Sequence, residues 1–316
     1  MTLMEGSASR GSKTRNQKLI DMVKETMTSM GLYEVVTYSI TSPNIYASIG
    51  ISNTSEYPIS VKIANPLGED QSIMRTTMMP SLLDVLSRNY NRRLESCSIF
   101  EVNPVFHPKA LPLTELPVET LTLALGEYGD GASFYTLKGK IEGVISQLGL
   151  EDKASFISAA HSALHPGRTA EVLIDGQSVG ILGEVHPKVA ENYQMDIRVF
   201  VAELNLQALL DLANTDKHYK ALPRYPAVTR DLALVVEKKI LAAQIQDTIK
   251  KSGGNILESV SLFDIYEGSQ IPVGFKSMAY ALTYRANDRT LKDEEVNKSH
   301  QKILKALENE LGAKLR

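Results

Sequence analysis

The side chains best suited to chemistry lie on the last predicted strands of the chain. Residues 257–285 carry Asp264, Tyr266, Ser277 and Arg285, and Arg316 follows on a short C-terminal segment that can reach the same surface. Because side chains alternate across a strand, Asp264 and Tyr266 are predicted to share one sheet face with Ser277 and Arg285. An acid, an aromatic ring, a hydroxyl and arginines over small residues could hold an unstacked nucleic-acid base. An ordinary solvated sheet face has the same composition, so both interpretations stay open.

The same alternation assigns the core face of these strands. Four large side chains recur along residues 276–285 and are predicted to pack under helices: Met278, Tyr280, Leu282 and Tyr284. On the preceding strand, Phe263 and Ile265 are predicted to be their core partners. This assignment leaves the small or polar side chains on an open face.

Other constellations predict no catalytic, cofactor or metal site in this chain. His161 and His165 are four residues apart, but Pro166 and Gly167 indicate a loop there, and no acidic third ligand is near. The glycine-rich stretches read as turns and caps, and no nucleophile-elbow motif occurs. The single cysteine, Cys97, is predicted to be a buried structural thiol.

The elements that must position the open face follow a recognisable order. The pattern predicts a strand at 231–236, a helix at 242–252, strands at 257–266 and 276–285, a helix at 292–311 and a short strand from 313. This β-α-β-β-α-β order is that of a ferredoxin-like domain, in which both helices cover one sheet face. Because that fold serves many functions, it does not decide the function here.

The rest of the chain predicts a separate α+β domain. Residues 1–15 read as a linker, 16–212 as a core domain, 213–222 as a second linker and 223–316 as the ferredoxin-like domain. In the core domain, long strands separated by helices, with a hairpin at Asp175-Gly176, favour a mixed or antiparallel sheet.

Composition and charge limit the classes of protein. The 316 residues are 43% hydrophobic, which suffices for two domains with their own cores. No apolar run reaches the roughly eighteen residues of a membrane span, so we expect a soluble cytoplasmic protein without membrane contact. The net charge is −3, but residues 223–316 hold 15 Lys and Arg against 12 Asp and Glu. This small positive surplus suits a partner that carries phosphate groups, but a chance difference in charge between the two parts of the chain would look the same.

Four ordered segments near the C-terminus resemble a known domain. They are residues 225–236 (YPAVTRDLALVV), 262–268 (LFDIYEG), 276–280 (KSMAY), and 289–291 with 293–296 (RTL and DEEV). They resemble the ferredoxin-like anticodon-binding domain of bacterial phenylalanyl-tRNA synthetase β subunits.

The resemblance extends upstream over essentially the whole chain. Residues 31–39 (GLYEVVTYS) look like a degenerate class II motif 1, while 65–67, 74–76, 100–102 and 105–106 resemble an altered motif 2. The words HPGR at 165–168 and GEVHP at 183–187 are also similar to the family, and residues 2–6 look like the linker that enters this core. No glycine-rich motif 3 with its ATP-binding arginine occurs. Arg75 and Glu101 are the nearest candidates for nucleotide contacts, and we expect them to be structural.

The resemblance implies the C-terminal half of a β subunit. Its class II synthetase-like core would be catalytically inactive and would pack against α subunits in an (αβ)2 assembly, while the terminal domain would hold the tRNA(Phe) anticodon. Tyr266 would stack, Asp264 and Ser277 would bond base edges, and Arg285 and Arg316 would meet phosphate or base. ATP and Mg²⁺ serve the full enzyme and are expected outside this chain, which would be inactive alone.

Three alternatives accompany this reading. The apolar face of the first helix and strand is the expected α-subunit contact, although an internal core explains it equally well: Met22, Val23, Met27, Met30 and Val35. The chain could instead be a stand-alone synthetase-like interaction or regulatory module that forms no complex with an α subunit. An autonomous ligase would show amino-acid-dependent ATP–pyrophosphate exchange, which we do not expect.

Overall fold

The chain divides into two compact units, Met1–Lys217 and His218–Arg316. The computed structural model describes residues 11–51, 58–217, 219, 221–268 and 270–316. The division falls within the polar stretch 213–222. Within the described ranges, no helix is both long and apolar enough to cross a membrane.

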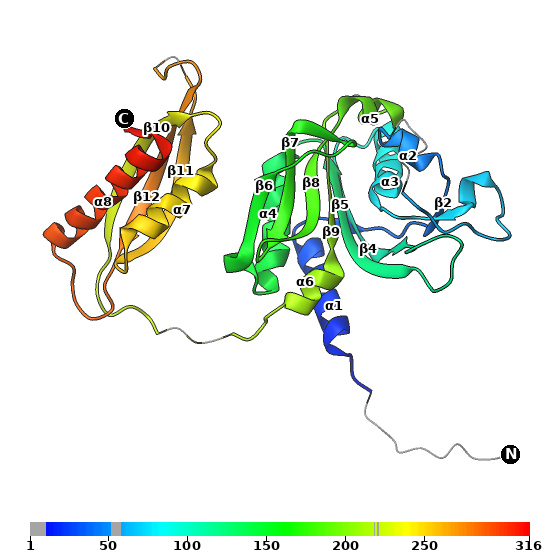
Figure 1. The fold of residues 1–316 in the computed structure, drawn as a ribbon, viewed down its shortest axis with the longest axis horizontal. Coiled ribbons are helices and arrows are strands. Elements are labelled where there is room, and N and C mark those ends of the chain that lie inside the picture. The colour runs from blue at the N-terminus through cyan, green and yellow to red at the C-terminus, as the bar shows by residue number, and fades with distance from the viewer. Residues whose placement is uncertain (1–10, 52–57, 218, 220, 269) are drawn as a thin grey trace. The chain divides into compact units, whose positions relative to one another are not determined.

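A seven-stranded sheet forms the centre of the first unit (Figure 1). Its order is β1-β4-β5-β9-β8-β7-β6, and neighbouring strands are antiparallel except for the parallel pair β1 and β4. The strands are β1 (Tyr33–Glu34), β4 (Cys97–His107), β5 (Val118–Tyr128), β6 (Ala154–Ser158), β7 (Leu164–Ile174), β8 (Gln177–Val185) and β9 (Val199–Asn205). The predicted mixed sheet is therefore confirmed.

Helices cover both faces of this sheet and create two apolar cores. On one face pack α1 (Arg15–Ser29), α4 (Phe134–Gln147) and α6 (Leu206–Leu212). On the other face pack α3 (Met79–Asn91) and α5 (Pro187–Asn192), and α2 (Ile45–Ser48) contacts α3. A separate small sheet pairs β2 (Ile40–Thr41) with β3 (Ile73–Met74). Cys97 is buried in the second core as a free thiol.

Turn and cap chemistry fixes the ends of several elements. Asp175 and Gly176 have φ angles of 49° and 78°, the left-handed values that a tight hairpin between β7 and β8 requires. The Asn205 side chain accepts a hydrogen bond from the Ala208 backbone N–H at 3.0 Å and caps α6. The hairpin agrees with the sequence prediction.

The first unit departs from the predictions at two places. Pro166 and Gly167 lie inside β7 instead of a loop, at a shift in the β7–β8 register between Leu164 and Thr169. The shift frees this stretch from regular pairing, which explains how a strand accommodates proline. The pattern of residues 33–40, rich in Val and Tyr, predicts one strand, but a strand forms only at its two ends, because Thr37 N–H donates to the Glu101 carboxylate (3.1 Å).

The second unit has the predicted β-α-β-β-α-β order. Its elements are β10 (Val228–Glu237), α7 (Ala242–Gly253), β11 (Leu257–Tyr266), β12 (Phe275–Tyr284), α8 (Asp293–Leu311) and β13 (Lys314–Leu315). The antiparallel sheet has the order β11-β12-β10-β13. Both helices pack on the same face of this sheet, so, among the described residues of the unit, its other face carries no helix (Figure 1). The ferredoxin-like fold is confirmed.

The core of the second unit confirms one predicted set of residues and corrects another. The four predicted core side chains of β12 are each 1% exposed or less: Met278, Tyr280, Leu282 and Tyr284. Phe263 and Ile265, however, are 58% and 50% exposed, so their assignment to the core was wrong. A register shift in the β11–β12 pairing between Leu262 and Asp264 breaks the regular alternation at Phe263. Ile265 still lies opposite Met278 on the helix side, and it is exposed because β11 is an edge strand of the sheet.

Candidate functional site

The helix-free face of the second unit brings Asp264 and Tyr266 to one surface. In the β11–β12 register, Asp264 lies opposite Ala279 and Tyr266 lies opposite Ser277. Directly opposed side chains share a face, and this face is the reverse of the one that carries Met278. Asp264 and Tyr266 are both exposed to solvent. The predicted placement of these two residues is therefore correct.

Arg316 lies against Tyr266 and forms the most distinct feature of this face. Its guanidinium carbon is 5.3 Å from the centroid of the Tyr266 ring, within the range of a cation–π contact. Arg316 Nη2 donates to Gln270 Oε1 at 3.2 Å, and its backbone N–H donates to Ala233 O at 3.1 Å. The backbone bond places Arg316 beside β10. The contact with Tyr266 shows which face of the sheet its side chain takes, which the sequence of this short segment did not fix.

Gly268 lets the Tyr266 ring lie close to the backbone. A Cβ atom added at Gly268 would come within 2.2 Å of the Tyr266 hydroxyl oxygen and 2.4 Å of its Cζ. Any side chain at this position would therefore displace the ring. Tyr266 is thus held between the backbone at Gly268 and the Arg316 guanidinium, with 36% of its surface exposed.

Two of the five predicted residues are placed differently from the expectation. Ser277 lies on the predicted face but is only 3% exposed, because its short side chain lies in register between Tyr266 and Val235. Arg285 follows the far end of β12. There its Nε donates to Glu258 Oε2 at 2.9 Å and its Nη1 donates to Tyr225 O at 2.8 Å. The structure therefore does not bring Arg285 together with Tyr266.

Phe263 is a candidate that sequence reasoning missed. It lies between Leu262, which packs on the core opposite Tyr280, and Asp264, which faces the open side. Alternation from Leu262 directs Phe263 toward the open side, next to Asp264. A bulge of this kind depends on how two strands pair, so one strand's alternation could not reveal it.

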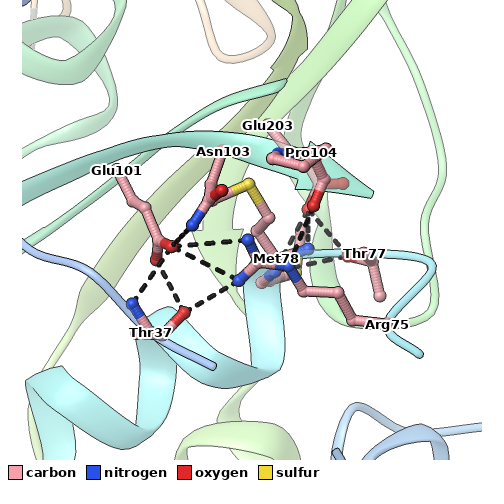
Figure 2. Close-up of polar contacts among 9 residues, drawn as sticks. Thr37, Arg75, Thr77, Met78, Glu101, Asn103, Pro104 and Glu203 are labelled. Carbon is pink, nitrogen blue, oxygen red and sulfur yellow. Dashed lines mark hydrogen bonds and ion pairs between the residues drawn. The ribbon is translucent and has the colours of Figure 1, made fainter. Parts of the chain in front are cut away.

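A second polar cluster lies inside the first unit, where Arg75 and Glu101 meet (Figure 2). Both side chains are buried, and Arg75 Nη1 and Nη2 donate to Glu101 Oε1 at 3.3 and 3.4 Å. Arg75 also donates from Nη1 to Thr37 Oγ1 (2.8 Å) and from Nε to Pro104 O (3.1 Å). Glu101 further accepts from Thr37 Oγ1 (2.7 Å) and Asn103 Nδ2 (3.0 Å).

This arrangement supports a structural role for Arg75 and Glu101. Among the described residues, every buried side-chain nitrogen or oxygen has a hydrogen-bond partner. Burial lowers the pKa of Arg75, while the charge and hydrogen bond of Glu101 raise it. The pair joins the segment after β1 to β4 and to the segment after β3. Its groups are committed to each other and to Thr37, Asn103 and Pro104.

The apolar side chains of the first helix divide between core and surface. Val23 and Met27 are fully buried against the sheet, and Met22 packs partly against the same cluster. Val35 packs partly on the second core, and Met30 is 36% exposed. The internal-core alternative therefore accounts for Val23 and Met27, which cannot reach a partner subunit.

The two histidines noted for their spacing each accept a hydrogen bond from the backbone two residues on. His161 Nδ1 accepts from Ala163 N–H at 3.2 Å, and His165 Nδ1 accepts from Gly167 N–H at 3.1 Å. In the part of the chain that the structure describes, no group of three or more His, Cys, Asp or Glu side chains is arranged to hold a metal ion.

Comparison with known families accounts for both units. Residues 1–206 match the model of the phenylalanyl tRNA synthetase beta chain CLM domain, and residues 223–316 match the ferredoxin-fold anticodon binding domain. The chain belongs to the phenylalanyl-tRNA synthetase beta-chain family. This membership confirms the resemblance seen in the sequence.

Individual members of the phenylalanyl-tRNA synthetase beta-chain family align with the whole chain. The phenylalanine–tRNA ligase beta subunit of Clostridium tetani is 44% identical over 315 residues, which are 100% of this chain and 40% of that protein. The beta subunit of Symbiobacterium thermophilum is 38% identical over 321 residues, or 98% of this chain and 36% of that protein. The chain thus spans about two fifths of these relatives' length, and its predicted place in their C-terminal half stays a prediction.

Proposed function

We propose that this chain is a non-catalytic part of a phenylalanine–tRNA ligase beta subunit and that its second unit binds the anticodon region of tRNA(Phe). The observation that carries the proposal is the helix-free sheet face on which Arg316 lies against the exposed Tyr266 ring. Single-stranded loops of RNA are bound in this way, with splayed bases stacked on aromatic rings or arginine planes.

The roles of the side chains follow from their placement. Tyr266 and Arg316 would stack on one base, a contact worth about 1–3 kcal/mol. Asp264, an exposed acceptor beside them, would take hydrogen bonds from an exocyclic amine on a base edge. Phe263 would offer a second ring. Ser277 would act as the small floor beneath Tyr266, and Arg285 would fix the segment at Tyr225 and the edge strand at Glu258.

The first unit would serve as a scaffold for an α subunit in an (αβ)2 assembly in the cytoplasm. Large side chains in β1 and in the segment that follows it support this: Tyr33, Val36 and Tyr38 are 78%, 81% and 79% exposed. Apolar side chains exposed in one short segment are typical of a surface that a partner covers. We expect ATP and Mg²⁺ to bind elsewhere in the assembly, because the Arg75–Glu101 pair is occupied internally.

The direct test is tRNA(Phe) affinity of the beta chain assembled with its α subunit. Tyr266→Ala and Arg316→Ala should each weaken binding by about tenfold or more, the equivalent of at least 1.4 kcal/mol. The matched control is Tyr135→Ala, which removes a tyrosine of α4 that is 78% exposed, and it should leave affinity unchanged. Unchanged affinity for both second-unit variants would overturn the assignment.

A further inference from the structure

A cavity of the first unit is not used by the proposed function. It has a volume of about 410 Å³ and lies where the N-terminus of α3 meets strands β7, β8 and β9 and the segment 159–161. Its polar lining includes Glu203, Glu171, His161 and Thr77, and its apolar lining includes Met79 and Ile181. This size is within the range of small-molecule sites.

The strand register places two carboxylates on the same wall of the cavity. Glu171 on β7 lies opposite Ile181 on β8, and Ile181 lies opposite Glu203 on β9. Directly opposed side chains share a face, so both glutamates point to the side of the sheet that carries α3. Their backbones are two strand spacings apart, roughly 9–10 Å, and one small group between the two side chains could meet both.

Glu203 uses only one of its two oxygens within the protein. Oε2 accepts hydrogen bonds from Thr77 Oγ1 (2.7 Å), Met78 N–H (3.0 Å) and Met79 N–H (3.1 Å), at the start of α3 (Figure 2). Among the described residues, none donates a hydrogen bond to Oε1, and because every buried side-chain oxygen there has a partner, Oε1 of this half-buried residue is open to solvent. Glu203 Oε2 thus binds the start of α3, while Oε1 remains available to a ligand in the cavity.

Other inward-facing glutamates of this unit have a cation in direct contact. Glu101 pairs with Arg75, Glu127 pairs with Lys140, and Glu184 accepts from both Arg168 and Arg198. Within the described ranges, Glu203 and Glu171 have no such ion pair. Burial raises the pKa of Glu203, and the hydrogen bonds from Thr77, Met78 and Met79 together with the charge of Arg75 offset only part of this effect.

The remaining lining supplies no positive charge. His161 Nδ1 accepts a backbone hydrogen bond from Ala163, which requires that nitrogen to be unprotonated. Burial lowers the pKa of His161 and so favours its neutral form. Met79 and Ile181 add an apolar wall beside the two carboxylates.

We propose that this cavity binds a small molecule that carries a protonated primary amine on a short apolar chain. The ammonium group lies between Glu203 Oε1 and the Glu171 carboxylate, and the chain lies against Met79 and Ile181. An ammonium has three donors and no acceptor, which matches two carboxylates that lack a cation.

The test uses the whole 316-residue chain with ¹³C-labelled methionine methyl groups. The Met79 methyl signal reports on the cavity during titration with n-butylamine, which is protonated at neutral pH. A parallel titration with n-butanol at equal ionic strength supplies a ligand of the same shape without the charge. We expect a saturable shift of the Met79 signal with the amine and no saturable shift with the alcohol.

Variants separate the two carboxylates from general effects of charge. Glu171→Gln leaves the cap of α3 intact and should weaken amine binding about tenfold, the equivalent of 1.4 kcal/mol. Glu203→Gln should weaken it at least as much if the variant folds. Glu119→Gln, at an exposed position of β5, is the control and should bind as the natural chain does. Equal responses to amine and alcohol, or full binding by Glu171→Gln, would overturn the proposal.

Discussion

At the scale of single residues, the buried charges of Arg75 and Glu101 form an ion pair in which both side chains also make further hydrogen bonds. Removing one partner of a buried pair leaves the other charge uncompensated, which costs more than the pair contributes. Arg75→Met should lower the free energy of unfolding by about 3–5 kcal/mol, measured by urea denaturation. The double variant Arg75→Met/Glu101→Leu should lose less unfolding free energy than Arg75→Met alone, because no buried charge is left without a partner.

An exposed ion pair gives the matched control for this prediction. The Lys109 and Glu115 side chains are 61% and 56% exposed and 3.0 Å apart, so Lys109→Met should change the unfolding free energy by less than about 1 kcal/mol. If Arg75→Met were equally mild, the structural role assigned to Arg75 would be incorrect.

Glu203 should give the stability of the first unit a distinctive pH dependence. Burial raises its pKa above the ordinary value of 4.5, so the folded chain holds this proton more tightly than the unfolded chain. The contribution of Glu203 to stability is therefore full below 4.5 and is lost as the pH rises through the folded pKa. The unfolding free energy of Glu203→Gln, measured relative to that of the natural chain, should therefore increase as the pH rises.

Glu184 provides the opposite sign in the same experiment. Burial would raise its pKa, but hydrogen bonds and charges of Arg198 and Arg168 outweigh burial and lower it. Its stabilising contribution is present above 4.5 and disappears as the pH falls through the folded pKa. In denaturation measurements, the stability difference between the natural chain and Glu203→Gln should change as the pH rises above 4.5, and the difference for Glu184→Gln should change as the pH falls below 4.5, with opposite signs along the pH axis.

Residue types alone predicted part of the candidate site. Tyr266 and Asp264 could be assigned to the open face because alternation holds from Asp264 onward. The burial of Ser277 and the internal bonds of Arg285 could not be predicted, because both depend on neighbours from other segments: Val235 and Tyr266 for the serine, Tyr225 and Glu258 for the arginine.

At the scale of elements, the bulge in β11 decides which side chains form the core and which remain exposed. Phe263 is 58% exposed and Tyr280 is fully buried, although both are aromatic side chains on adjacent strands. Phe263→Ala should therefore cost less than about 1 kcal/mol of unfolding free energy. Tyr280→Ala should cost about 3–5 kcal/mol, as large-to-small changes in a packed core do.

Urea denaturation of the two alanine variants distinguishes the observed register from the alternating one predicted by sequence. In the alternating register, Phe263 would be a core residue and its replacement would be as costly as that of Tyr280. The sequence could not show the difference, because the extra residue is absorbed only when β11 pairs with β12.

At the scale of the whole molecule, each unit has its own apolar core. The clusters around Leu82 and Leu123 belong to the first unit, and the cluster around Tyr280 belongs to the second. Units with separate cores unfold as separate cooperative transitions. Leu82→Ala should lower the stability of the first unit only, and Tyr280→Ala that of the second only.

Hydrogen exchange resolved by residue would measure both stabilities in one sample. A single shared transition, shifted equally by either variant, would contradict independent units. The order of elements in the second unit was predictable because periodicity and turn residues are local signals. The seven-strand order was not, since pairing of β5 with β9 joins segments far apart in the sequence.

The central claim is that the helix-free face of the second unit contacts RNA, and an NMR titration tests it most directly. The chain, labelled with ¹⁵N, would be titrated with an RNA hairpin that contains the tRNA(Phe) anticodon stem and loop. Amide signals of Asp264, Tyr266, Ala279 and Arg316 should shift, while those of α7 and α8 should not. Shifts confined to the two helices, with the sheet face unperturbed, would contradict the account.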